Sequence, residues 1–300
     1  MATIYAHIGS EKCGSSLIEL LFLNNQSMRD MLESQGIVSA TQFHVALRKN
    51  VVGTQWDEGV HGRIKSQLLT PLRMSGKDVF ISEELLLNLT HEKEKPNPLD
   101  LRIGFSKRLL QGFDQIKIIL IVRRQDKFIE SHYNQQVKRG ETRAFEEVLE
   151  NLTLDNYCWD VIADAWAEGF GKDNVTIIPF ERSVLESAEG GAKNIVPAVC
   201  RVMGINVDIR TDDLPIVNPS LRPELLNAQR EINATMDRAT AEKVADILAM
   251  KVLKVPGAAQ GLFSPEGRQH LLDRYAASNR RLFEKYIPQC SVDEYLTAAD

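Results

Sequence analysis

The sequence predicts an α/β fold in which helices cover both faces of a parallel sheet. Short, apolar, β-branched segments bounded by turn signals are typical of buried parallel strands. Longer segments with apolar residues at helical spacing alternate with them. After Gly190 only helical patterns follow. We therefore expect one domain over residues 1–300, with an α/β core over 1–190 and a mainly helical portion over 191–300.

The expected elements follow one another in regular alternation. Strands are expected at Thr3–Ile8, Asp78–Ile81, Ile116–Val122 and Asn174–Ile178. Helices are expected at Ser15–Glu33, Gly62–Met74, Leu99–Phe113, Asp126–Arg139 and Asp155–Phe170. The later helical patterns lie near Ala192–Met203, Pro223–Met250 and Pro265–Tyr286. The charged, proline-bearing stretch His91–Asp100 is predicted to be a surface loop.

Composition limits the partners that this chain can attract. The net charge is −5, so no overall field draws the protein to nucleic acid or to an anionic membrane. No apolar run approaches the roughly 20 residues of a membrane span, and the first residues do not resemble a signal peptide. The four cysteines are far apart and show no metal-ligand spacing. We expect a cytoplasmic protein with reduced thiols, no transmembrane segment, no nucleic-acid partner and no metal site.

The amino terminus contains a candidate phosphate-binding loop. An apolar strand runs into a turn of small residues and then into a helix, so backbone N–H groups at the helix start would face an anion. Gly9 and Gly14 occupy the glycine positions of a G-x-x-x-x-G-K-[ST] nucleotide loop, but Ser15 stands where that loop has its lysine. The lysine lies inside the turn instead. The candidate binding residues are Gly9, Lys12, Cys13, Gly14, Ser15 and Ser16.

A second candidate anion site follows the strand Ile116–Val122. This strand ends in Arg123 and Arg124, and ligands of open α/β sheets bind beyond the carboxyl ends of the strands. Both arginines are therefore expected at the mouth of the Lys12 loop. Arginine offers several donors to a phosphate, and the Ser131 hydroxyl on the next helix adds a neutral one. Taken alone, these residues could simply end a strand and cover a helix surface. Because an altered phosphate loop is expected at the same edge of the sheet, we favour a second anion site.

The residues His7-Ile-Gly-x-x-Lys12-x-Gly14-Ser-Ser are similar to the 5′-phosphosulfate loop of the sulfotransferases that use 3′-phosphoadenylyl sulfate (PAPS). Arg123 with Ser131 resembles the 3′-phosphate motif of that family. The chain resembles the bacterial sulfotransferase-like branch further at 121–138, 166–175, 218–221 and 278–282. The resemblance thus covers most of the chain and implies a P-loop type of fold.

The resemblance implies transfer of a sulfuryl group from PAPS to a hydroxyl acceptor, with adenosine 3′,5′-bisphosphate (PAP) as product. The acceptor class that it implies is a small molecule or glycan, above all a carbohydrate or glycolipid. Lys12 would stabilise the leaving phosphate without a metal ion. An acceptor hydroxyl also needs a base. Glu83 and Glu84, at the end of the Asp78–Ile81 strand, are the candidates, and the similarity to the family's Ser-Glu text favours Glu83 slightly. The alternative is that both are acids at a helix N-terminus, stabilised by its dipole. His7 is the less favoured base.

Two features depart from the family pattern. The chain has no Arg-Lys-Gly triplet, which supplies further 3′-phosphate contacts in many relatives, so Arg280 or Arg281 would have to substitute. Cys13 stands where the family often has serine or alanine. Two other functions stay open: a phosphate-loop kinase that uses ATP and magnesium, and a protein that keeps the fold without turnover. Acceptor identity and oligomeric state are not encoded in any motif that the sequence displays.

Overall fold

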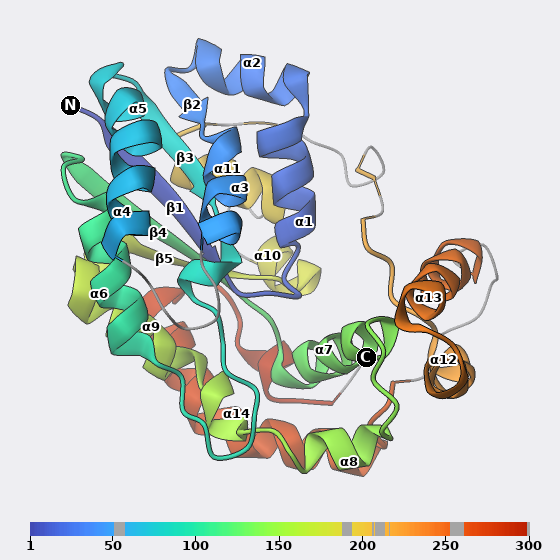
Figure 1. Cartoon of the computed structure of the whole chain (residues 1–300). Coiled ribbons are helices and arrows are strands. Elements are labelled where there is room, and N and C mark those ends of the chain that lie inside the picture. The colour runs from blue at the N-terminus through green and yellow to red at the C-terminus, as the bar shows by residue number, and fades with distance from the viewer. Residues whose placement is uncertain are drawn as a thin grey trace.

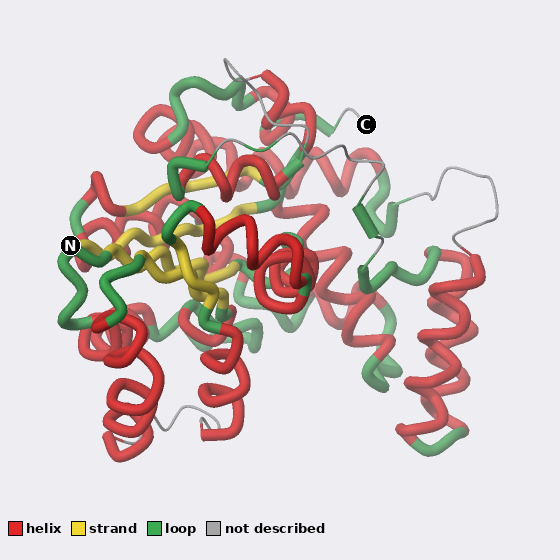
Figure 2. The backbone as a smooth tube through the Cα atoms, turned by 90° about the horizontal axis from the view of Figure 1, so that it is seen from above, coloured by secondary structure: helices red, strands yellow, loops and turns green. Residues whose placement is uncertain are grey.

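The computed structural model confirms the predicted α/β class. It describes residues 1–50, 58–187, 194–205, 207, 214–215, 217–252 and 261–298. A five-stranded, all-parallel sheet with strand order β2-β3-β1-β4-β5 forms the central layer (Figure 1). Its strands are β1 (Thr3–Gly9), β2 (Ile37–Ser39), β3 (Asp78–Ser82), β4 (Gln115–Val122) and β5 (Val175–Pro179). Helices lie on both sides of this layer (Figure 2).

Helices fill the connections between the strands and most of the chain after β5. Before β3 lie α1 (Ser15–Ile18), η1 (Glu19–Asn24), α2 (Gln26–Ser34), α3 (Thr41–Asn50), α4 (Glu58–Ile64), η2 (Lys65–Leu69) and α5 (Thr70–Met74). Between β3 and β5 lie η3 (Glu84–Leu86), α6 (Leu99–Leu110), α7 (Gln125–Lys138), α8 (Phe145–Leu149), η4 (Leu154–Tyr157), α9 (Trp159–Phe170) and η5 (Lys172–Asn174). After β5 follow α10 (Arg182–Ser187), α11 (Ile195–Val202), α12 (Pro223–Thr235), α13 (Arg238–Val252), α14 (Pro265–Tyr286) and η7 (Asp293–Tyr295).

The four predicted strands are confirmed to within one residue at each end, and one strand was missed. That strand, β2, has three residues and lies at the edge of the sheet beside β3. Three residues are too few to show a strand periodicity, so neither Ile37 nor Val38 signalled it. The boundary expected between residues 190 and 191 lies outside the described residues.

Two of the predicted helices are divided by local capping. The helix expected over Ser15–Glu33 breaks at Asn25, whose side chain accepts a hydrogen bond from the Met28 N–H at 2.9 Å and thereby begins α2. The helix expected over Pro223–Met250 is a pair, α12 and α13. Its break has a similar cause, because Asp237 accepts a hydrogen bond from the Thr240 N–H at 3.0 Å. Capping side chains inside an otherwise helical pattern therefore account for both differences.

The C-terminal helices pack on the sheet core and beside α7. α9 contacts β4 and β5, α14 contacts α9 and α7, and the pair α12–α13 contacts α7 (Figure 1). The predicted helical C-terminal portion is therefore confirmed for the part of it that the structure describes. Trp159 and Trp166 of α9 are fully buried and form part of the core. Among the described residues, no helix combines the length and the apolar character that crossing a bilayer requires.

A buried group of charges joins α7 to α14. Arg124 donates to Asp126 at 2.7 and 2.9 Å, and both side chains are fully buried. Arg268 of α14 contacts Asp126 and donates to Glu130 at 2.9 Å. Arg124 therefore does not lie at the mouth of the site as the sequence suggested. Its guanidinium is committed to Asp126, which lies in the first turn of α7 and does not cap that helix.

Candidate active site

The loop after β1 is fastened to the neighbouring strand β4. The Ser10 N–H and hydroxyl both donate to the Ile121 carbonyl, at 2.8 and 2.9 Å. The Ser10 hydroxyl also lies 2.9 Å from the Cys13 sulfur. Cys13 is fully buried, and burial raises the pKa of its thiol, so it packs beneath the loop as a neutral group. These contacts hold residues 10–13 as a rigid turn at the carboxyl end of the sheet.

The end of this loop requires a glycine. Gly14 precedes α1 with φ +83°, in the left-handed region that favours glycine. A β-carbon at this position would also lie 2.4 Å from Ile195 Cδ1 and 3.1 Å from a Phe180 ring carbon. α1 begins directly after it at Ser15 and continues into η1, so the first N–H groups of a ten-residue helical segment open toward the loop.

Arg123 is held against this loop. Its guanidinium donates to the Lys12 carbonyl at 3.0 Å and lies 5.0 Å from the centre of the Phe180 ring. Its own carbonyl accepts a hydrogen bond from the Trp159 indole at 2.8 Å. Two segments that are 111 residues apart are thus joined by a direct side-chain contact. The Lys12 loop and the end of β4 are therefore in contact, as the topology predicted.

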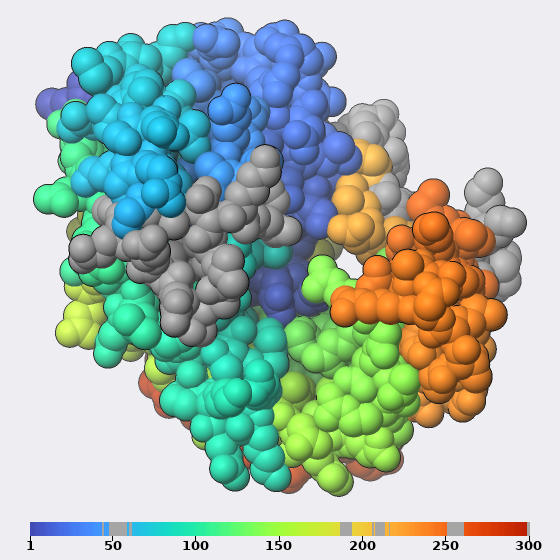
Figure 3. All heavy atoms as spheres, viewed as in Figure 1, coloured from blue at the N-terminus to red at the C-terminus, as the bar shows by residue number. Residues whose placement is uncertain are grey.

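One large cavity, of about 1280 Å³, collects most of the predicted site residues. Of these, Lys12, Gly14, Ser15, Ser16, Glu84, Arg123 and Ser131 line it. The described part of the segment 214–220 and Phe180 to Ser183 after β5 form further parts of its wall. In the space-filling view the surface is hollowed between the N-terminal part in blue, α7 in green and the C-terminal helix pair in orange (Figure 3). Burial lowers the pKa of the Lys12 ammonium, and the carboxylates Glu11 and Glu84 act against this shift.

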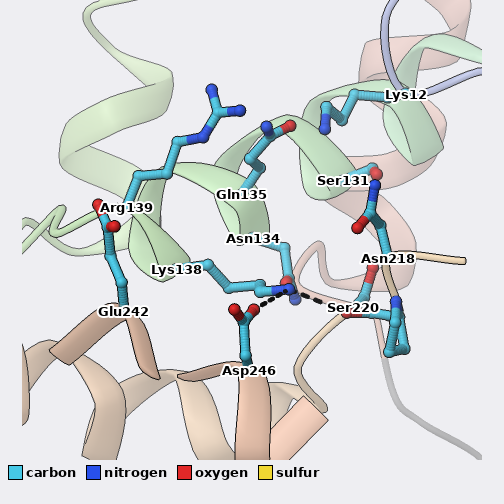
Figure 4. Close-up of a pocket in the computed structure, with 11 residues that line it drawn as sticks. Lys12, Ser131, Asn134, Gln135, Lys138, Arg139, Asn218, Ser220, Glu242 and Asp246 are labelled. Carbon is cyan, nitrogen blue, oxygen red and sulfur yellow. Dashed lines mark hydrogen bonds and ion pairs between the residues drawn. The ribbon is translucent and has the colours of Figure 1, made fainter. Parts of the chain in front are cut away.

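A smaller cavity of about 260 Å³ adjoins the first and shares Lys12 and Ser131 with it. Its other walls come from the later turns of α7, from Asn218 to Ser220, and from Glu242 and Asp246 of α13 (Figure 4). Lys138 pairs there with Asp246 at 3.0 Å. Arg139 also lines both cavities, and its charge acts to lower the pKa of Lys12. Polar side chains therefore surround the space next to the Lys12 ammonium.

The two candidate acids have different surroundings. Glu83 is fully buried, and its carboxylate accepts a hydrogen bond from the Leu85 N–H at 3.0 Å as the cap of η3. Glu84 lines the large cavity. Burial raises the pKa of Glu84, while a hydrogen bond with Ser15 and the charge of Lys12 partly counteract that shift. A carboxylate with a raised pKa at the wall of a cavity is suited to accept a proton.

The remaining residues that the sequence suggested lie away from the walls of both cavities. His7 is fully buried, its Nδ1 lies 2.8 Å from the Ser82 hydroxyl, and burial lowers its pKa to about 3. Gly9 ends β1 with φ +119° and lies behind the loop. Arg281 pairs with Asp160 at 2.7 Å on the exposed side of α14, and neither it nor Arg280 lines either cavity. Arg139, directly after α7, is the arginine that the structure places beside Lys12 and Ser131 instead.

Two asparagines complete the wall. Both lie in segments that the sequence singled out, 121–138 and 218–221, but their hydrogen-bond partners had no sequence signal. The Asn218 amide donates to the Ser16 hydroxyl at 2.7 Å, which joins the segment before α12 to the start of α1. Asn134 of α7 exchanges two hydrogen bonds with the Leu221 backbone, at 2.6 and 2.9 Å. Since both contacts span more than 80 residues, no local pattern could have revealed them.

Comparison with known proteins gives few relatives. No protein-family model matches the chain. An uncharacterised protein of Archaeoglobus fulgidus is 24% identical over 173 residues, which are 57% of this chain and 46% of that protein. The chain therefore spans about half the length of the curated relative that it matches.

Two solved structures are similar along nearly the whole chain. A crystal structure of a sulfotransferase from Alicyclobacillus acidocaldarius is similar over 93% of this chain and 94% of that one, at 15% identity and a TM-score of 0.45. The sulfotransferase domain of the Synechococcus PCC 7002 olefin synthase is similar over 91% and 94%, at 14% identity and a TM-score of 0.32.

Proposed function

We propose that this protein is a sulfotransferase that moves a sulfuryl group from PAPS to a hydroxyl acceptor, with PAP as the other product. One observation carries the proposal: Lys12 and the Arg123–Ser131 pair line the same cavity from different segments of the chain. A donor with two separate phosphate groups requires two such sets of cationic and hydroxyl donors. A 5′-triphosphate alone does not require the second set.

The residues of the cavity fit such a donor. Lys12 and the N–H groups at the start of α1 form one anion site, and Arg123 with Ser131 forms the other. The cavity of about 1280 Å³ exceeds the several hundred Å³ that a small-molecule ligand usually needs, so it has room for an acceptor as well. Arg139 supports the second site, because it lines the cavity beside Ser131 in a chain without an Arg-Lys-Gly triplet.

In the proposed reaction the donor supplies the sulfuryl unit, the bond from sulfur to the phosphate oxygen breaks, and a bond from sulfur to the acceptor oxygen forms. Lys12 neutralises the negative charge that develops on the leaving phosphate, which is where a fixed cation contributes most to the rate. Glu84 takes the proton of the acceptor hydroxyl. Glu83 caps η3 and thereby positions its neighbour Glu84, so we assign it no direct contact with the acceptor.

The acceptor is proposed to be a carbohydrate or glycolipid. Amide, hydroxyl and carboxylate side chains surround the space next to Lys12, among them Gln135, Asn218 and Asp246. Such groups hydrogen-bond to several hydroxyls of one ligand and have little to offer an apolar acceptor. This polar lining supports a sugar over a hydrophobic alcohol.

Nucleotide binding tests the donor. PAP without magnesium should raise the melting temperature of the protein, and ATP with magnesium should not. Lys12→Ala should weaken PAP binding about 10- to 100-fold, since a hydrogen bond to a charged group contributes about 1.5–3 kcal/mol. Lys77→Ala is the matched control, because Lys77 pairs with Glu33 at 2.6 Å away from the cavity.

Three outcomes decide between the functions. Stabilisation by ATP and magnesium with no response to PAP would replace the sulfotransferase with a kinase. Equal PAP affinity of Lys12→Ala and Lys77→Ala would show that the loop does not bind the donor. PAP binding without transfer of labelled sulfate to any member of a sugar panel would favour a protein that binds the donor without turnover.

A further inference from the structure

Three potential metal ligands converge beside the Lys12 loop. They are Glu11 of the loop, His91 in the segment after η3, and His132 of α7. Glu11 Oε1 lies 2.7 Å from His91 Nε2 and 3.1 Å from His132 Nδ1. Each of the three ligand atoms lies within 4.8 Å of the other two. No pattern in the sequence indicated this group, because its members come from three separate segments.

The outer nitrogen of each imidazole is also engaged. His91 Nδ1 lies 2.9 Å from the Tyr157 hydroxyl, and His132 Nε2 lies 2.8 Å from the Gln136 side-chain amide. Histidines that bind a metal usually have such an outer partner, which fixes the ring and its tautomer. The two rings are themselves in contact, with centroids 3.9 Å apart. Both inner nitrogens are therefore held toward the same carboxylate oxygen.

Gln136 supplies an independent observation. Its Oε1 is buried and has no hydrogen-bond partner among the described residues. The oxygen and nitrogen of a side-chain amide exchange places by a half-turn, which would bring Oε1 to His132 Nε2. His132 Nε2 would then carry the proton, and the lone pair of Nδ1 would face the Glu11 carboxylate. In that orientation either a proton or a metal ion would bridge His132 Nδ1 and the Glu11 carboxylate, which lie 3.1 Å apart.

The surroundings admit an ion. The side chains of Glu11, His91 and His132 are 30%, 17% and 11% exposed, so the group is sheltered and still reachable from solvent. Two imidazoles and one carboxylate are a ligand set of mononuclear zinc sites, in which a water molecule takes the fourth position. The carboxylate also neutralises part of the charge of a divalent ion.

We propose that Glu11, His91 and His132 bind one divalent ion of the zinc type. The ion would join the loop, the segment after η3 and α7 at one point. Two of its ligands are sequence neighbours of Lys12 and Ser131, so the ion would fix the distance between the two anion sites. Zinc binding does not depend on which donor or acceptor the protein uses, and it can be tested without either.

The test uses the whole protein, freed of metal by a chelator and then titrated with Zn²⁺ alone. We expect one ion to bind per chain and to raise the melting temperature. Co²⁺ in its place should give the intense visible absorption of a four-coordinate site, without the charge-transfer band of a thiolate ligand. His91→Ala should abolish both signals. His270→Ala, an exposed histidine of α14, should leave them unchanged.

A second variant keeps the test valid if His91→Ala folds poorly. Tyr157→Phe retains the buried ring and removes only the outer partner of His91, so it should weaken Zn²⁺ binding about 10- to 100-fold. The proposal is wrong if Zn²⁺ does not bind to the wild type. It is also wrong if Tyr157→Phe and His91→Ala both bind Zn²⁺ as tightly as the wild type does. The three side chains would then form only a hydrogen-bonded group, in which both imidazoles contact the Glu11 carboxylate. Loss of PAP binding would not affect this result, because no nucleotide is present.

Discussion

The substitution Asp126→Asn should destabilise the protein strongly. Asp126 is fully buried and accepts two hydrogen bonds from Arg124, at 2.7 and 2.9 Å, besides its contact with Arg268. The amide cannot balance the charge of two guanidinium groups held in the interior. Removing one partner of a buried ion pair costs about 3–5 kcal/mol. We therefore expect the free energy of unfolding to fall by about that amount, measured by urea denaturation near neutral pH.

The protein offers a matched control. Asp155 also forms an ion pair with an arginine, Arg274, at 2.7 Å, but the Asp155 side chain is 79% exposed. Surface ion pairs contribute about 0–1 kcal/mol because water screens them, so Asp155→Asn should be nearly neutral. If the two variants lose the same stability, burial does not determine the contribution of these pairs. A loss below about 1 kcal/mol for Asp126→Asn would refute the reasoning, since that is what surface pairs contribute.

The buried ion pair of Asp126 with Arg124 should make the stability of the protein depend on pH. Burial acts to raise the pKa of Asp126, but the hydrogen bonds and charges of Arg124 and Arg268 outweigh it and hold the pKa below its ordinary value. The folded state thus binds this proton less readily than the unfolded state. The stabilisation is fully present above pH of about 4 and is lost as the pH falls toward the folded-state pKa. The stability difference between wild type and Asp126→Asn should therefore shrink on acidification.

Two further outcomes follow from the site. Glu84→Gln should lower the turnover of sulfate transfer about 10²- to 10⁴-fold with PAP affinity retained, because it removes the proposed base and no donor contact. In the wild type, the acid limb of the kcat/KM profile should lie above the ordinary glutamate pKa, since burial raises the pKa of Glu84; a limb at the ordinary value would count against this residue. Gly36→Ala should cost about 1–2 kcal/mol, because φ is +81° and nothing lies within 4 Å of the added carbon. Gly14→Ala has nearly the same φ and should cost more in thermal denaturation, because its added carbon meets Ile195; equal losses would show that Ile195 yields freely.

The sequence predicted the strand framework because buried strands are marked locally. Ile116–Val122 is a continuous apolar run apart from Lys117, and the structure buries its last five residues completely. The turn that carries Lys12 could also be predicted from the sequence, because its two glycines and its lysine lie within six residues. Arg123 was placed correctly from topology alone, because carboxyl ends of parallel strands share one edge of the sheet.

What the sequence could not provide depends on contacts between distant segments. Arg124 and Arg123 are neighbours of the same residue type, yet one is buried against Asp126 and the other lines the cavity. Contacts with distant segments separate their roles, because Arg268 of α14 meets Asp126 and the Arg124 guanidinium also donates to the Glu294 carbonyl at 3.2 Å.

His91 was missed for a similar reason, because its partners lie on other elements. Arg139 does have a local signal. It follows Ser131 by eight residues and Gln135 by four, so the predicted helix places all three on one face.

The Asn134 contact with Leu221 has a consequence for how the protein can be divided. It fixes to α7 the segment that carries Asn218, so the last third of the chain forms part of the wall around Lys12. A fragment that ends after β5 would keep all five strands and the loop but would lack this wall. Exchanging residues 214–252 between relatives should therefore alter which ligands are accepted while the sheet stays the same. The stretch of chain that supplies the five strands and the stretch that supplies the wall around Lys12 therefore have different boundaries.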